Sequence, residues 1–147
     1  CLQSMIVREM TKEDLPRILE CERKCFKDPW NEENCLNEFD ENPFSHGWVL
    51  IDERIVGYAF LWETFEMAQL ARIGVDPDDQ GKGYGDILLK ACIQRSKEQN
   101  CEFMTLDVRV SNEKAIRLYQ KNGFIQVNVS KRYYPDGEDA LVFTRAL

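Results

Sequence analysis

The chain has 147 residues, of which 44% are hydrophobic and 31% charged, as expected of one globular domain. Its net charge of −7 disfavours nucleic acid as a partner, because phosphate contacts require clustered Lys and Arg, and suits a basic peptide or protein. No apolar run reaches the roughly 20 residues that cross a membrane, so we expect no membrane partner.

Residues 1–4 lack the basic and apolar stretches of a signal peptide. We expect them to be a cloning remnant, with a single domain spanning residues 5–147 in the cytoplasm. The six cysteines are then expected to be reduced thiols. Cys21 and Cys25 share one face of a predicted helix, but no second close pair of Cys or His completes a site, so we expect no metal.

Apolar periodicity and turn residues predict the following elements in chain order. They are a strand at 5–10, helices at 15–26 and 31–41, strands at 48–51, 55–62 and 67–75, a helix at 83–99, a strand at 103–108, a helix at 112–121, and strands at 124–134 and 140–146. The early strands form a meander and the later ones alternate with helices. This order predicts an α/β fold with a mixed sheet, antiparallel at first and partly parallel later.

A glycine-rich turn, Gln80-Gly81-Lys82-Gly83-Tyr84-Gly85, lies where a predicted strand ends and a helix begins. Unpaired N–H groups in the first turn of a helix, together with the helix dipole, favour a bound phosphate. The spacing matches neither a Walker A loop nor a dinucleotide fingerprint. Each glycine in a helix costs about 1 kcal/mol relative to Ala, so three within five residues favour a phosphate site over a plain helix start.

The pattern Gln80-x-x-Gly83-x-Gly85, after Ile73-Gly74-Val75, resembles the acetyl-CoA signature of the GNAT superfamily of N-acetyltransferases. The resemblance extends over residues 5–147. Later segments narrow it to the ribosomal-protein-alanine N-acetyltransferases, the RimI family; they are Leu106–Asn112, Leu118-Tyr119, Tyr133-Tyr134-Pro135 and Glu138-Asp139-Ala140.

This resemblance implies a V-shaped sheet, split between parallel strands at 68–75 and 103–108 and flanked by helices. Acetyl-CoA, as cosubstrate, would occupy the split. The residues implied to bind it are Ile73, Gly74 and Val75 for the pantetheine, Gly81, Lys82, Gly83, Tyr84, Gly85 and Asp86 for the diphosphate, and also Gln80 and Asn112. Many relatives have a basic residue at the position of Asp86, and Lys82 could compensate for that difference.

The family also implies two catalytic residues. Tyr119 matches the general acid toward the coenzyme A sulfur, with a core tyrosine as the alternative. Asp107 stands where these enzymes usually have glutamate, and its side chain is about 1.5 Å shorter. It could act as a base through one water, or be a structural carboxylate paired with Arg109.

Trp30, Tyr134 and Glu138 are expected to wall a slot for an extended N-terminus, with hydrophobic packing as the alternative for the aromatic residues. The resemblance thus implies acetyl transfer to the N-terminal alanine of a basic ribosomal protein. Two alternatives remain open: acetylation of another N-terminus, a lysine or a small amine, and a non-catalytic acyl-CoA-binding module.

Overall fold

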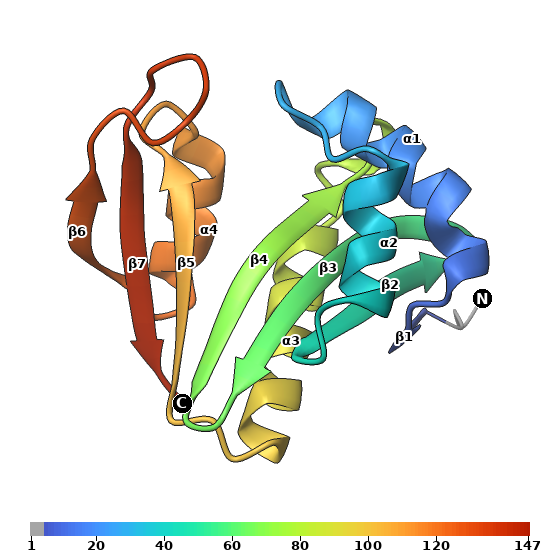
Figure 1. The fold of residues 1–147 in the computed structure, drawn as a ribbon, viewed down its shortest axis with the longest axis horizontal. Coiled ribbons are helices and arrows are strands. Elements are labelled where there is room, and N and C mark those ends of the chain that lie inside the picture. The colour runs from blue at the N-terminus through green and yellow to red at the C-terminus, as the bar shows by residue number, and fades with distance from the viewer. Residues whose placement is uncertain (1–4) are drawn as a thin grey trace.

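The computed structural model describes residues 5–147, so the expectation for residues 1–4 lies outside the described chain. Seven strands form one sheet in the order β1-β2-β3-β4-β5-β7-β6 (Figure 1). The strands are β1 (Ile6–Glu9), β2 (Ser45–Asp52), β3 (Arg54–Thr64), β4 (Met67–Val75), β5 (Phe103–Arg109), β6 (Ile125–Ser130) and β7 (Ala140–Ala146). The helices are α1 (Leu15–Cys25), α2 (Glu32–Asp40), α3 (Tyr84–Glu98) and α4 (Glu113–Lys121), and 3-10 turns occupy Lys12–Asp14 and Pro77–Asp79.

These elements confirm the predicted order, and the largest differences in strand bounds are at β2 and β6. β2 begins at Ser45 rather than at residue 48, because Ser45 already pairs with Trp62 of β3. β6 ends at Ser130, and the prediction that this strand continues to residue 134 is wrong. Arg132 has a φ of 47°, a left-handed conformation that turns the chain away from the sheet.

The sheet is split in the middle, as the V-shaped fold requires. β4 and β5 are parallel and pair only over Met67–Gln69 and Phe103–Thr105. Beyond these residues β4 stays with β3 while β5 stays with β7, so the two halves diverge (Figure 1). The divergence opens the sheet at the carboxyl ends of both strands.

Helices cover the two faces unequally. On one face, α3 and α4 pack against the apolar residues of both halves, with Leu88, Leu106 and Phe143 at the centre. On the other face, α1 and α2 pack against β2, β3 and β4, with Ile18 and Phe60 at the centre. Figure 1 shows α1 and α2 over this half of the sheet, so the β5-β7-β6 half has helices on one face only.

Within residues 5–147, no helix combines the length and the apolar character needed to cross a membrane.

Candidate active site

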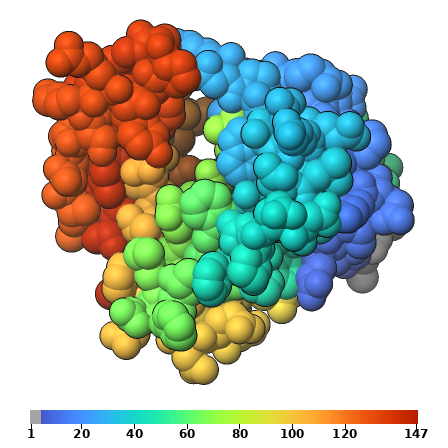
Figure 2. All heavy atoms as spheres, in the orientation of Figure 1, coloured from blue at the N-terminus to red at the C-terminus, as the bar shows by residue number. Residues whose placement is uncertain are grey.

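A cavity of about 1220 Å³ fills the split between β4 and β5. Its walls come from the α1–α2 loop, β4, the turn before α3, the end of β5, the start of α4 and the β6–β7 loop. Figure 2 shows it as a hollow between the orange β6–β7 loop and the blue α1–α2 segment. The cavity therefore joins both halves of the sheet.

A β-bulge shapes the β4 wall of the cavity. The β3–β4 ladder shifts register at Ala71, between the paired residues Leu70 and Arg72. Arg72 consequently faces α1, where it meets Glu22, while the next residue, Ile73, packs on the α3 side. The backbone of residues 73–75 thus borders the split as β4 diverges from β5.

The glycine-rich turn lies at one end of the cavity, as the sequence predicts. Gly81 and Gly83 have φ values of 84° and 81°, which favour glycine, and a Cβ on either would meet no atom within 4 Å. Gly83 precedes the first residue of α3, and no side chain caps this helix. The first-turn N–H groups beside these glycines form a cradle suited to an anion.

Two polar side chains at this turn are hydrogen-bonded to residues outside it. The Tyr84 hydroxyl bonds the Asp52 carboxylate. Asp86 accepts hydrogen bonds from Lys90 and Asn122, and the Lys90 bond first, then Asn122, lowers the Asp86 pKa to about 2. Asp86 is therefore charge-balanced by its neighbours. Many relatives have a basic residue at this position, and here the Asp86 carboxylate is bonded to Lys90 of α3 and to Asn122 at the end of α4.

Gln80 connects the two sides of the split, and Asn112 fixes the start of α4 on one of them. Gln80 Oε1 accepts a hydrogen bond from Lys114 Nζ of α4 at 2.8 Å. Asn112 caps α4, since its Oδ1 accepts from Ala115 N at 3.2 Å. Both predicted residues line the cavity, whereas Lys82 lies 4.0 Å from Asp79 and is not part of the lining.

Tyr119 reaches the cavity from the α3/α4 side. Only 5% of it is exposed, and its ring packs against Phe124 and Phe143. Burial, with smaller contributions from Tyr134 and Cys92, raises the pKa of the phenol above its usual value. Tyr119 is therefore protonated at neutral pH, the state required of an acid.

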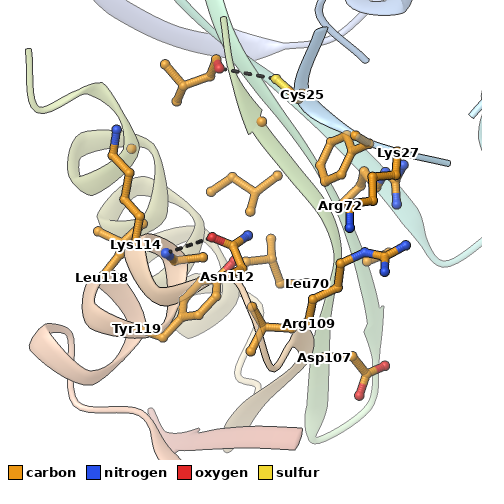
Figure 3. A pocket seen from close by; sticks show the side chains of 18 of the residues that line it. Cys25, Lys27, Leu70, Arg72, Asp107, Arg109, Asn112, Lys114, Leu118 and Tyr119 are labelled. Atoms are coloured by element: carbon orange, nitrogen blue, oxygen red, sulfur yellow. Dashed lines mark hydrogen bonds between the residues drawn. The ribbon is translucent and has the colours of Figure 1, made fainter. Parts of the chain in front are cut away.

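Asp107 approaches the cavity from the opposite face. Its neighbours on β5, Leu106 and Val108, belong to the core beneath α3 and α4, so alternation directs Asp107 the other way. Burial first, and then the charge of Asp107, raise the pKa values of Tyr133 and Tyr134. In the view of Figure 3, Tyr119 lies beside its helix and Asp107 lies apart from it, with strand ribbon between them.

Arg109 ties together the two loops that border the opening of the cavity. Its guanidinium donates to Asp28 of the α1–α2 loop at 2.6 Å, and to Asp136 and Glu138 of the β6–β7 loop at 3.0 and 2.8 Å. It also lies 4.1 Å above the Tyr134 ring. Arg109 is thus not the partner of Asp107 but the link across the split.

Of the three predicted substrate residues, Trp30 and Tyr134 line the cavity and Glu138 does not. Glu138 accepts from Ser111 N at 2.8 Å as well as from Arg109. Hydrogen bonding with the Ser111 side chain, and then with Arg109, lowers the pKa of Glu138. Glu138 therefore does not border the cavity directly but holds Arg109, which does.

A buried glutamate fixes the loop that carries Trp30. Glu22 is fully buried and accepts from Tyr58 Oη at 2.6 Å, from Trp30 N at 2.8 Å and from the Arg72 guanidinium at 2.9 Å. Arg72 also donates to the Asp28 carbonyl at 2.9 Å. The sequence analysis missed Glu22, Arg72 and Asp28, because these contacts join residues up to 50 positions apart and no local motif signals them.

Within residues 5–147, no group of three or more His, Cys, Asp or Glu side chains could hold a metal ion. The five cysteines in this range are free thiols. Cys92 and Cys101 are buried, which is usual for cysteines that pack as small apolar groups.

Comparison with known proteins decides the family. The profile of the acetyltransferase (GNAT) family matches residues 13–124, which is most of the chain. This chain belongs to the GNAT family. It is an N-acetyltransferase, and acetyl-CoA is its cosubstrate.

Relatives of this GNAT enzyme match it along nearly its whole length. A Bacillus subtilis (strain 168) protein, provisionally named a ribosomal protein bS18-alanine N-acetyltransferase, is 36% identical over 92% of this chain and 91% of its own. The Salmonella typhimurium (strain LT2) enzyme of that name is 31% identical over 88% of both chains. The crystal structure of the ribosomal-protein-S18-alanine N-acetyltransferase from Escherichia coli has a TM-score of 0.89 at 28% identity, over 97% of this chain and 93% of the other.

The cavity of this GNAT enzyme fits its cosubstrate. The turn at Gly81 and Gly83 suits a diphosphate, because it has first-turn N–H groups and a Cβ at either glycine would meet no atom within 4 Å. The volume of about 1220 Å³ leaves room for a second molecule beside the cosubstrate.

Proposed function

We propose that this GNAT enzyme acetylates the N-terminal alanine α-amine of a ribosomal protein. The observation that carries the proposal is the similarity to enzymes named for this activity, one of them 31% identical over 88% of both chains. A ribosomal substrate would also place the reaction in the cytoplasm.

Acetyl-CoA supplies the acetyl thioester, and the chain's own residues hold it. In our proposal the main chain of Ile73, Gly74 and Val75 pairs with the pantetheine, while the amides of residues 81–86 bind the diphosphate. Gln80 and Asn112 support this seat from the two sides of the split. The side-chain positions favour amide contacts, since Tyr84 and Asp86 are engaged elsewhere.

Asp107 and Tyr119 are proposed as base and acid. A free α-amine has a pKa of about 7.7–8.0, so roughly one in seven is neutral at pH 7. Deprotonation of the amine therefore needs only modest help from a base. Asp107 would take the amine proton through one water, which offsets its short side chain. Tyr119 would give its phenolic proton to the thiolate sulfur. Burial, which raises the pKa of the phenol, keeps it protonated until the thiolate forms.

The acceptor is proposed to enter between the two loops that Arg109 links. Trp30 and Tyr134 form opposite walls of this entrance, and Glu138 acts on it through Arg109. An extended N-terminus is thin enough for a narrow slot, and the net charge of −7 favours a basic chain behind it.

A mass-spectrometric screen of basic peptides with free and blocked N-termini, supplied with acetyl-CoA, tests this proposal. We expect acetylation at the α-amine, fastest when the first residue is alanine. Acetylation of lysine side chains in blocked peptides only, or no turnover of any amine, would contradict it in favour of the alternative acceptors or a non-catalytic acyl-CoA-binding module.

A further inference from the structure

A second hollow of about 190 Å³ adjoins the candidate active site. It is lined by the β3–β4 hairpin and the turn after α2, through Asn42, Phe44, Trp62, Thr64, Met67 and Gln69. Trp62 and Gln69 also line the large cavity, so the two spaces are direct neighbours. In Figure 2 the green hairpin atoms and the teal atoms after α2 lie side by side below the larger hollow.

Strand register places this hollow on the α2 face of the sheet. Trp62 pairs with Gln69 and Thr64 pairs with Met67, so all four side chains alternate onto one face. Trp62 Nε1 donates to Glu38 of α2 at 2.5 Å, which identifies the face and fixes the indole ring.

Asp107 lies on this same face. Gln69 pairs in parallel with Thr105, which precedes Asp107 by two residues on β5 and therefore points to the same side. With about 3.3 Å per residue along a strand and about 4.8 Å between strands, the hollow lies roughly 12 Å from Asp107. An extended peptide covers that distance in about four residues.

The lining of the hollow is suited to an apolar group. Phe44 is 45% exposed, and Trp62 and Met67 contribute an aromatic ring and an adaptable thioether to the lining. Covering exposed apolar surface beside a binding cavity with an apolar side chain is favourable, because it removes that surface from water.

We propose that this hollow is a subsite for an apolar side chain of the acceptor polypeptide, at about the fourth residue from the acetylated amine. The inference rests on the proposed N-terminal acetylation. It adds a specificity determinant remote from the first residue, carried by Phe44, Trp62 and Met67.

Alanine-initiated hexapeptides carrying either Leu or Ser, in turn at positions 3 to 6, test the subsite. We expect kcat/KM to be about tenfold higher for Leu than for Ser at one position near the fourth, because a partly buried Leu gains about that factor. Phe44→Ser should reduce this ratio to about one. Phe65→Ser, the same change on a ring that is 89% exposed and outside the hollow, should preserve it.

Equal kcat/KM for Leu and Ser at every position, or a ratio that survives in Phe44→Ser, would overturn the subsite while α-amine acetylation continued. Failure to acetylate any α-amine would instead contradict the proposed function, and the subsite with it.

Discussion

At the scale of single residues, the candidate chemistry depends on two groups in contrasting surroundings. Tyr119 is buried among aromatic rings on the α3/α4 side, whereas Asp107 faces the entrance between the two loops. An acid in an apolar site keeps its proton, and a carboxylate near water can pass one on. The split in the sheet lets both groups reach a common space.

Replacing Tyr119 tests the acid. Tyr119→Phe should lower kcat by about 10²–10⁴-fold, since the ring packing stays and only the proton donor is lost. Because burial raises its pKa, Tyr119 stays protonated as pH rises, so we predict no alkaline loss of wild-type kcat below about pH 10. A pH profile of kcat that falls near pH 8 would contradict this assignment.

Replacing Asp107 tests the base. Asp107→Asn keeps the size of the side chain and removes the proton acceptor, so kcat/KM should fall by about 10²-fold at pH 7. Asp107→Glu should retain most activity, because it restores the longer carboxylate usual in this family. The loss should shrink toward pH 9, where the acceptor amine is already neutral. An Asp107→Asn variant with unchanged kcat/KM at pH 7 would exclude the base role.

At the scale of elements, the turn before α3 is the feature that sequence predicted best. Its glycines are close together in sequence, and positive φ with an open helix start follows from local chemistry. The order of the strands and helices was also predictable, because apolar periodicity and turn residues are local features of the sequence. β6 was predicted to end too late in the chain. The chain turns at Arg132, which is left-handed, and no glycine or proline at that position marks the turn.

A substitution in this turn should separate cosubstrate binding from folding. Gly83→Ala puts a Cβ on a left-handed residue beside the proposed phosphate cradle, at a cost of about 1–2 kcal/mol in stability. We expect the KM for acetyl-CoA to rise at least tenfold. Gly137→Ala, at a φ of 90° with equally open surroundings, should carry a similar stability cost and leave that KM unchanged. Equal KM values in both variants would argue against the cradle.

At the scale of the whole molecule, the cavity is completed by contacts between distant segments. Arg109 and Asp28 are 81 residues apart, and Glu22 and Arg72 are 50 apart. Neither pair has a spacing that a sequence pattern could reveal. The family resemblance supplied Asp107 and Tyr119, but the residues that hold the walls in place emerged only from the fold.

Loosening the link across the split should weaken acceptor binding selectively. Arg109→Lys cannot keep the bonds to Asp28 and the β6–β7 loop together, because an ammonium lacks the guanidinium fork. The peptide KM should rise about tenfold while the KM for acetyl-CoA changes less than twofold. Arg95→Lys, which removes a guanidinium from the Trp48 ring outside the cavity, is the matched control. An unchanged peptide KM in Arg109→Lys would show that the link does not shape the entrance.

The central claim, that the acceptor is an N-terminal α-amine, is tested most directly with one peptide. A basic peptide with a free N-terminal alanine and an internal lysine is incubated with the enzyme and acetyl-CoA, and tandem mass spectrometry locates the acetyl group. Our account predicts that the label lies on the alanine nitrogen and that blocking the N-terminus abolishes it. Acetyl groups on the lysine, unaffected by the blocked N-terminus, would contradict the account.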